Sequence, residues 1–376
     1  MYRRTTSSPY HLTSGLLPDG IQKNTSMEVF AIGDVHGQGD MLEELLAEIA
    51  AMRRTAPQRC VVFLGDLIDR GPASVKAMSL AYHAAEITGA DEVYILAGNH
   101  ELLLIDSILS VAPELGRDFS IGNQGNSRTD VTTASDVRDR LGQSYMTSFE
   151  PFMLWWGNGG SKMFSEVARQ AVDDETLDED LREVLRAPIA GYPDEQMMNA
   201  FVGSLVRGSS PCPPVGQTSI TTIWPVLLSL RSHLRIGNIL FVHAGIAPKR
   251  PIAACLDIPW HAHISKNAIH WAWIREHFLT WQGGWNDSGT ARGPTDLDSP
   301  DRPDTLVVHG HTPCTRTGAR SADLSTREGL VHALDQHKTH ARLNLDIDAA
   351  AGLGVAAAHF TGDRRVRLLS VSRELG

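Results

Sequence analysis

The chain contains three short apolar runs of β-forming residues, the first of which begins at residue 29, and each run is followed by a glycine. The runs are Val29–Ile32, Cys60–Leu64 and Val93–Ala97. Short runs of this kind predict buried strands. Apolar residues at helical spacing follow the first run, and a second predicted helix begins at Pro72 and extends to about Ile87. This alternation predicts a mainly parallel sheet with helices packed against it.

The middle of the chain has a different pattern. Residues 112–235 are first polar and irregular and then charged and helix-prone, which predicts a mostly helical insert or cap. The strand pattern resumes at Asn238–Val242 and Thr305–Val308, with a Trp-rich predicted helix at Trp271–Phe278 between them. The tail, Ala341–Leu369, alternates as two or three predicted strands.

Residues 1–26 differ in pattern from the rest of the chain, and this difference sets the expected domain organisation. Residues 1–26 are polar and have no apolar periodicity, so a disordered extension is expected there. Residues 27–376 are expected to form one domain, and a chain that is 42% hydrophobic can bury a core of that size.

Charge and cysteine usage exclude several classes of protein. The 34 basic and 44 acidic residues leave a net charge of −10, which disfavours nucleic acid as a partner. The four cysteines form no CxxC pair, so they fit a reducing cytoplasm better than a disulfide framework. No apolar stretch approaches the ~20 residues of a membrane span, and residues 1–26 lack the apolar core of a signal peptide. The expected location is therefore the cytoplasm, without membrane contact.

Five motifs rich in possible metal ligands each follow an apolar run. They are GDVHG (Gly33–Gly37), GDLIDRG (Gly65–Gly71), GNHE (Gly98–Glu101), VHAG (Val242–Gly245) and HGHTP (His309–Pro313). Side chains beyond the carboxyl ends of parallel strands meet at one edge of a sheet. Asp, His and Asn in that position predict a site for two divalent cations, and such sites mostly hydrolyse phosphate esters.

The first two motifs suggest distinct roles for their residues. Asp34 and His36 lie two residues apart after a tight turn, so both can face one ion. Asp66 can bridge two ions because a carboxylate has two oxygens, whereas Asp69 would not reach the same ion. Arg70 offers a planar fork that suits phosphate oxygens, and the neighbouring motifs favour this role over a simple surface ion pair with an aspartate.

The remaining motifs supply one more oxygen ligand and several histidines. Asn99 is a neutral oxygen ligand, and His100 beside it is better interpreted as a general acid whose tautomer is fixed by a carboxylate such as Asp69. His243 is a further candidate ligand. His309 and His311 are two residues apart at the end of a strand, so geometry does not choose between them.

The order of these motifs resembles the calcineurin-like metallophosphoesterases, and GDLIDRG with GNHE resembles the phosphoprotein phosphatase branch. Local segments resemble its bacterial serine/threonine protein phosphatase-like members: WWGNGG, FVHAGIAP, WAWIREHFL, VVHGHTP and RLNLD. The resemblance implies an α/β fold, a two-sheet α/β/β/α sandwich with a mostly helical insert. The metal ligands it implies are Asp34, His36, Asp66, Asn99, His243 and His311, with Asp66 shared between two sites. The catalytic residues it implies are His100, Asp69, Arg70 and Arg275, with Arg292 a nearby alternative to Arg275.

The same resemblance implies a metallophosphatase. The reaction would be hydrolysis of a phosphate monoester by a hydroxide that two divalent metal ions activate, Mn²⁺ first among them, with Fe or Zn as alternatives. Pro313 replaces the second histidine of many related diesterases, which favours monoesters. A serine/threonine protein phosphatase acting on a phosphorylated protein or small phosphate ester is expected. The alternatives are a symmetrical dinucleoside polyphosphate (diadenosine tetraphosphate) hydrolase and a catalytically dead metal-binding scaffold.

Overall fold

Two β-sheets organise the chain, which we describe from a computed structural model. The described residues are 2–6, 10–11, 27–122, 150–187, 193–207, 213–285, 287, 305–314, 341–361 and 365–373. The larger sheet has seven strands in the order β1-β11-β10-β3-β4-β5, with β2 beside β11. They are β1 Tyr2–Thr6, β2 Tyr10–His11, β3 Met27–Ile32, β4 Gln58–Phe63, β5 Glu92–Ile95, β10 Gly354–Phe360 and β11 Arg365–Arg373. The three strands from the first apolar runs are parallel, and the others pair antiparallel.

The smaller sheet has four strands in the order β6-β7-β8-β9. They are β6 His233–Ile236, β7 Ile239–Val242, β8 Leu306–His309 and β9 Arg342–Asn344. The first pair is antiparallel and the other pairs are parallel. Both sheets therefore present the carboxyl ends of parallel strands, where ligand sites form.

The period-2 alternation along β3 divides the core into two layers. Phe30 and Ile32 pack with residues from the helices. Val29 and Ala31 pack instead with Phe241 and other residues of the smaller sheet. Because successive side chains of a strand point to opposite faces, one strand serves the helical layer and the layer between the sheets. The predicted two-sheet α/β fold is confirmed.

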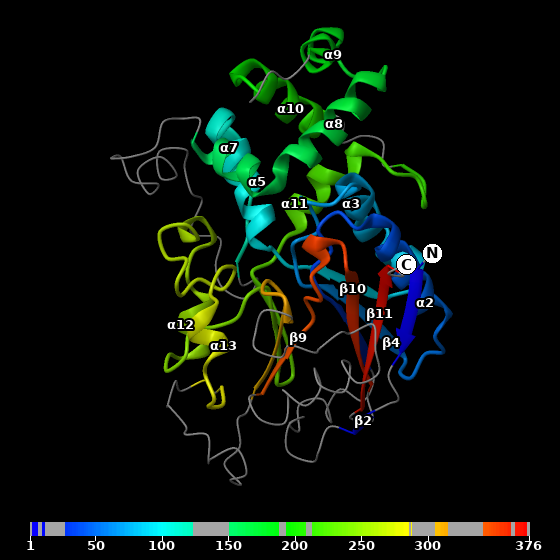
Figure 1. The fold of residues 1–376 in the computed structure, drawn as a ribbon, viewed down its shortest axis with the longest axis vertical. Coiled ribbons are helices and arrows are strands. Elements are labelled where there is room, and N and C mark those ends of the chain that lie inside the picture. The colour runs from blue at the N-terminus through cyan, green and yellow to red at the C-terminus, as the bar shows by residue number, and fades with distance from the viewer. Residues whose placement is uncertain are drawn as a thin grey trace.

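Helices cover the larger sheet and extend beyond it. In the order of the chain they are α2 Gly39–Ala51, α3 Ser74–Tyr82, α4 Ala84–Thr88, α5 Asn99–Val111, η1 Pro113–Asp118, α7 Glu150–Trp155, η2 Trp156–Gly160, α8 Ser161–Asp173, α9 Glu179–Arg186, α10 Glu195–Arg207, η3 Ile220–Thr222, α11 Ile223–Ser229, α12 Ile252–Leu256, η4 Trp260–Ala262, α13 Glu276–Leu279 and η7 Ala349–Ala351. Figure 1 shows α8, α9 and α10 grouped at one end of the molecule, away from the sheets. They belong to the stretch 112–235, of which residues 123–149, 188–192 and 208–212 lie outside the described residues.

The expectation for the amino terminus is wrong in part. Tyr2–Thr6 pairs with β11 over five residues, and Arg4 and Thr6 contact Glu44 and Glu48 of α2. An edge strand uses backbone groups to pair and leaves its side chains exposed, so it needs no apolar periodicity. The remainder of 1–26, apart from Tyr10–His11, lies outside the described residues.

Two helix predictions also need correction. The helix predicted from Pro72 to Ile87 begins at Ser74 and is divided at His83. The Trp-rich segment is helical only from Glu276 to Leu279. The carbonyl of Trp271 accepts a hydrogen bond from Ala244 N, 2.9 Å away, so tertiary contacts override the apolar spacing.

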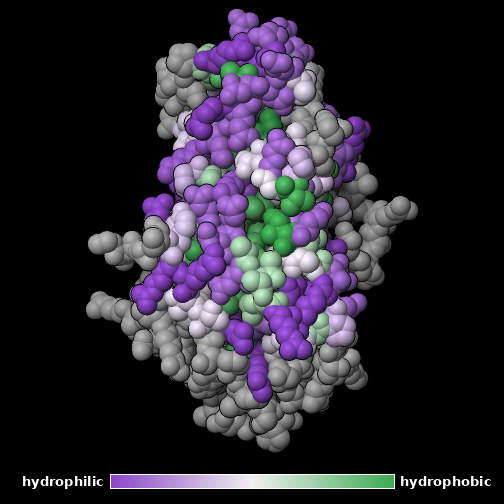
Figure 2. Space-filling view, turned by 90° about the vertical axis from the view of Figure 1, so that its right-hand side faces the viewer, coloured by the Kyte–Doolittle hydropathy of each residue, from purple (hydrophilic) through white to green (hydrophobic). Residues whose placement is uncertain are grey.

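The surface is mostly polar where it is described. Figure 2 shows one face covered largely by hydrophilic residues, with hydrophobic residues gathered near its middle. The exposed large hydrophobic residues of the described part are Val215, Leu228 and Leu353. None of the helices among the described residues could span a bilayer.

Candidate metal centre

The predicted ligands lie on loops whose backbone is held in an unusual conformation. His36, Asp66, Asp69, Arg70 and His311 have positive φ angles of 45°, 52°, 71°, 64° and 69°. A residue other than glycine rarely adopts this conformation, which costs about 1–3 kcal/mol, and it persists only where the surroundings enforce it. Concentration of such residues at these strand ends indicates a functional site.

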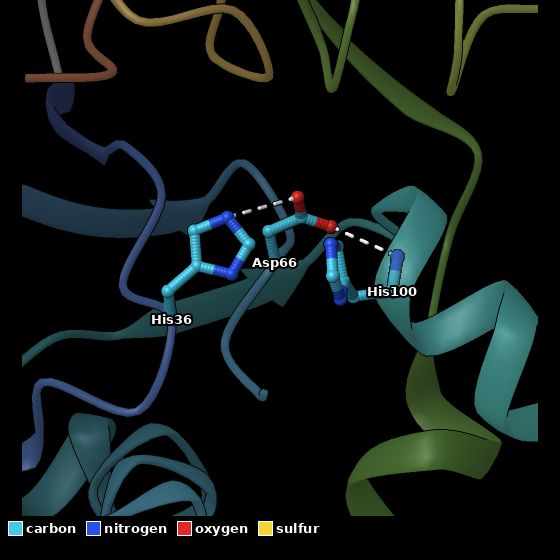
Figure 3. A group of neighbouring side chains, drawn as sticks. All are labelled: His36, Asp66 and His100. Carbon is cyan, nitrogen blue, oxygen red and sulfur yellow. Dashed lines mark hydrogen bonds and ion pairs between the residues drawn. The ribbon is translucent and has the colours of Figure 1, made fainter. Parts of the chain in front are cut away.

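Asp66, just beyond β4, is the centre of the cluster. Its carboxylate lies 3.4 Å from the Nε2 atoms of both His36 and His243, and it accepts a hydrogen bond from the backbone N–H of His100 at 3.0 Å. Figure 3 shows His36 and His100 facing Asp66 from two sides. The N–H of His100 belongs to the first turn of α5, where a helix favours a negative charge.

The described residues contain two groups of convergent ligand atoms, and Asp66 belongs to both. One group is His36, Asp66 and His100, and the other is Asp66, His243 and His311. Atoms of each group lie within 4.8 Å of one another. A shared carboxylate between two groups is the arrangement predicted for a two-metal site.

Asp34 and Asn99 contact members of these groups. The Asp34 carboxylate is 3.9 Å from His36 Nε2 and accepts the backbone N–H of His311 at 3.0 Å. Asn99 Oδ1 is 3.1 Å from His243 Nε2. All the predicted ligands are therefore brought together.

His311, and not His309, joins Asp66 and His243. His311 Nε2 contacts the carbonyl of Trp273 at 3.2 Å, which leaves its buried Nδ1 without a partner in the described residues. The ring of His309 packs instead against Phe278, with centroids 4.8 Å apart. His309 Nε2 also has no partner in the described residues, but of the two histidines that the spacing left open only His311 belongs to a convergent ligand group.

His100 is held by a buried carboxylate, as predicted. Its Nδ1 lies 2.8 Å from Asp69 Oδ2, and Trp155 Nε1 donates to the same carboxylate at 3.0 Å. His100 Nε2 is buried and has no partner within the described part of the chain. Trp155 was not predicted as a site residue. The motif WWGNGG contains it, but no spacing rule connects it to Asp69, 86 residues away.

Two arginines border the ligand cluster. The backbone N–H and Nε of Arg70 are each 3.3 Å from carbonyls of Gly159 and Asn158. Arg275 donates from one guanidinium nitrogen to the carbonyl of His311 at 3.1 Å and to Thr312 Oγ1 at 2.8 Å. Both guanidinium groups are tethered beside the predicted ligands. Arg292 lies outside the described residues.

The electrostatics of the cluster fit cations. Burial, with Asp346 nearby, raises the pKa of Asp34 well above its usual value. Burial opposes charge on His243, yet the adjacent Asp66 raises the pKa of this histidine to about 9. Burial lowers the pKa of His36 to about 3, so its ring is neutral and can act as a ligand. Buried carboxylates need positive charge, and the donor set of oxygens and imidazoles suits divalent metal ions.

Glu101 has a structural role that extends beyond the start of α5. Its two carboxylate oxygens accept the backbone N–H groups of Asp66, Leu67 and Gly98 at 2.8–2.9 Å. Burial, followed by the charge of Asp66, raises the pKa of Glu101 to about 7. This carboxyl group therefore ties the loop after β4 to the loop after β5, which fixes Asp66 relative to His100.

Glycines let the carboxylates approach the backbone closely. A side chain at Gly310 would overlap Asp34 Oδ1, and one at Gly98 would overlap Asp66 Oδ1. The glycines in HGHTP and GNHE are thus required by packing against the ligands themselves.

Sequence comparison assigns the class that this geometry suggests. Residues 27–179, which contain GDVHG, GDLIDRG and GNHE, match the family profile described as calcineurin-like phosphoesterase. The resemblance inferred from the motifs is therefore confirmed for this part of the chain.

Individual relatives are similar over shorter stretches. A candidate serine/threonine-protein phosphatase of Caenorhabditis elegans is 32% identical over 91 residues, 24% of each chain. The asymmetrical bis(5'-nucleosyl)-tetraphosphatase of Oceanobacillus iheyensis is 37% identical over 79 residues, 20% of this chain and 30% of that one. The symmetrical enzyme of Janthinobacterium sp. (strain Marseille) is 31% identical over 115 residues, 31% of this chain and 36% of that one. The matched stretches thus span about a quarter to a third of these relatives.

Proposed function

We propose that this protein hydrolyses phosphate monoesters at a two-metal centre and acts as a serine/threonine protein phosphatase. The observation that carries the proposal is Asp66, whose carboxylate belongs to two groups of ligand atoms, beside a histidine with a free nitrogen. Two divalent cations bound there would lower the pKa of a water molecule and neutralise phosphate charge.

The ligand roles follow from the contacts. Asp34 and His36 would hold one cation, and Asn99, His243 and His311 the other, with Asp66 shared. The coordinating nitrogens would be Nε2 of His36 and His243, because the Nδ1 atoms face the carbonyls of Ile68 and Leu64 at 3.2 and 2.9 Å. For His311 the coordinating nitrogen would be Nδ1. A backbone carbonyl that fixes the opposite ring nitrogen is the usual support of a histidine ligand.

Side chains around the cations would bind the phosphate and donate a proton to the leaving group. Arg70 and Arg275 are placed to bind the phosphate oxygens and to hold the phosphorus in line for attack. His100 donates a proton from Nε2 to the leaving oxygen. Asp69 keeps the opposite nitrogen of this ring engaged, and Trp155 Nε1 keeps the Asp69 carboxylate in place.

His100 also belongs to a convergent ligand group, which leaves two roles for it. The Asp69 contact supports the acid role, because it orients the ring and presents one nitrogen to the site. A ligand role would need the same Nε2 to bind a cation with His36 and Asp66. Substitution at His100 distinguishes these roles, because only the ligand role predicts lost metal.

A second candidate is hydrolysis of dinucleoside polyphosphates. Two of the relatives described above carry that name. A cavity of about 390 Å³ beside α13 is lined by Lys249, Arg250, His277 and Trp281, among others, and Lys249 Nζ lies 5.8 Å from the Trp281 ring. Cationic groups next to an indole could receive a nucleotide. The residues that line this cavity are close in sequence to His243 and Arg275.

A substrate panel tests both candidates. The protein is stripped with a chelator and assayed with Mn²⁺, Zn²⁺ or Fe²⁺ restored. The substrates are a phosphoserine peptide, a phosphotyrosine peptide, p-nitrophenyl phosphate and diadenosine tetraphosphate. We expect metal-dependent hydrolysis of the phosphoserine peptide with the highest kcat/KM. Release of ADP from diadenosine tetraphosphate with a higher kcat/KM would favour the second candidate, and no metal-dependent hydrolysis of any substrate would refute both.

A further inference from the structure

A second cavity lies at the other end of the larger sheet and has no part in the proposed reaction. Its volume is about 450 Å³, and it lies where α2 and β10 end. Its lining residues are Met52, Arg53, Arg54, Thr55, His359, Thr361 and Arg367. The cavity adjoins Glu28 near the start of β3, whereas Asp34 follows the end of that strand. At ~3.3 Å per residue this separates the cavity from Asp34 by about 20 Å.

Two side chains in this cavity have buried nitrogens without partners. His359 pairs with Phe30 on one neighbouring strand and with Arg367 on the other. Directly paired residues share a face of a sheet, so these three side chains form one row. In the described part of the chain, His359 Nδ1 and Arg367 Nε are both buried and have no hydrogen-bond partner.

Other contacts fix the His359 ring. It stacks on Phe30 with centroids 4.0 Å apart, and its Nε2 donates to Glu28 Oε2 at 3.1 Å. The ring therefore cannot turn its free nitrogen elsewhere without losing both contacts. A fixed imidazole nitrogen at a cavity wall needs a partner, because an unmade buried hydrogen bond costs about 1–3 kcal/mol.

Positively charged side chains outnumber negatively charged ones around the cavity. Glu28 is already engaged by Arg59 Nε at 2.7 Å and by Thr55, and Arg54 pairs with Asp91 at 2.9 Å. Arg53 and Arg367, by contrast, have no carboxylate partner among the described residues. In a protein of net charge −10, two guanidinium groups at one cavity thus lack a carboxylate partner among the described residues.

We propose that this cavity binds a small phosphate-bearing anion, either inorganic phosphate or a phosphate monoester. The anionic oxygens would accept hydrogen bonds from Arg53 and Arg367, which suit tetrahedral oxyanions. A P–OH group would donate to Nδ1 of a neutral His359, or an oxygen would accept from Nδ1 of the charged ring. A hydrogen phosphate group provides both functions, so it satisfies the two buried nitrogens together.

Phosphate binding to the metal-free full-length protein tests the proposal. Isothermal titration with inorganic phosphate is performed after chelation, so that cations do not hold the anion. We expect one site per chain in the wild type, and affinity lower by about tenfold or more in Arg367→Gln and Arg53→Gln. Arg117→Gln is the matched control, because the Arg117 side chain is 73% exposed and lies on η1, outside the cavity lining.

Four further measurements make the outcome decisive. Arg70→Gln should leave this affinity unchanged, because Arg70 belongs to the metal centre. Each variant should keep the wild-type melting temperature without phosphate, and Arg53→Gln should hydrolyse p-nitrophenyl phosphate normally once metal is restored. Titration with glycerol 3-phosphate decides the source of the anion: tighter binding than phosphate indicates a monoester. Wild-type affinity in Arg53→Gln, which is exposed and cannot unfold the core, would refute the proposal, as would loss of binding in Arg70→Gln alone.

Discussion

Substitution of His100 by asparagine separates a proton donor from a metal ligand. The side chain lies 2.8 Å from Asp69, is fully buried and presents Nε2 to the cluster around Asp66. Asparagine keeps a polar group of similar reach but cannot deliver a proton. The value of a proton depends on the leaving group, because a serine alkoxide needs protonation and p-nitrophenolate, a weak base, hardly does.

The expected magnitudes differ between two substrates. General acid catalysis typically contributes roughly 10²–10⁴-fold, which is about 2.7–5.4 kcal/mol of transition-state stabilisation. We therefore expect His100→Asn to lower kcat by that factor with a phosphoserine peptide and by much less with p-nitrophenyl phosphate. Metal content, measured by mass spectrometry of the purified variant, should equal that of the wild type.

Two neighbouring substitutions serve as graded controls. Asp69→Asn should show the same substrate pattern with a smaller loss, because Asp69 only orients the ring. Trp155→Phe removes one hydrogen bond to Asp69 and should have the weakest effect, in the same direction. Equal losses on both substrates, together with a missing metal ion in His100→Asn, would show that His100 is a ligand and would refute the assignment.

Four other predictions test the rest of the structure. Asp66→Asn should abolish activity and lose about one metal ion per chain, and full metal content would contradict the bridging role. Gly159→Ala should lower kcat/KM about 10–100-fold, since its Cβ would lie 2.7 Å from the Cγ of Arg70, for which we propose phosphate binding, whereas Gly157→Ala, with no atom within 4 Å, should match the wild type. Burial opposes ionisation of Glu28, but hydrogen bonds from His359, Thr55 and Arg59 lower its pKa to about 2. The carboxylate therefore stabilises the fold by about 3 kcal/mol above about pH 4.5, and this stabilisation is lost as the pH falls towards 2. Acid unfolding of Glu28→Gln should lack this component. A chain beginning at Met27 should melt roughly 2–4 °C lower because it loses β1, and an unchanged melting temperature would show that the strand adds no stability.

The sequence was sufficient to predict which side chains the structure brings together at this site, because their signals are local. Asp34 and His36 follow an apolar run and sit between glycines, and parallel strands bring such positions to one edge of the sheet. The same logic applies to His243, which follows a strand of the second sheet. Residue type and position after a strand carry this information without any knowledge of distant contacts.

Other features depend on contacts that no local pattern encodes. Trp155 reaches Asp69 through the packing of α7, so its apolar ring and distance along the chain gave no sign of the hydrogen bond. Tyr2–Thr6 forms an edge strand with exposed side chains, which resembles an unstructured polar segment in sequence. Trp271 has the spacing of a helix, but its carbonyl pairs with Ala244 instead. In each case a long-range contact decides the structure.

The left-handed backbone of the site residues has a consequence for engineering of this protein. Glycine adopts positive φ angles without a steric penalty, so replacing His36, Asp69 or Arg70 by glycine would relieve local backbone strain while it removed a group from the centre. Where this relief outweighs the loss of the hydrogen bonds that the side chain makes, thermal selection without an activity screen would favour inactive variants. A library designed for heat resistance should hold these codons fixed and vary α9 and α10, which lie at the far end of the molecule (Figure 1).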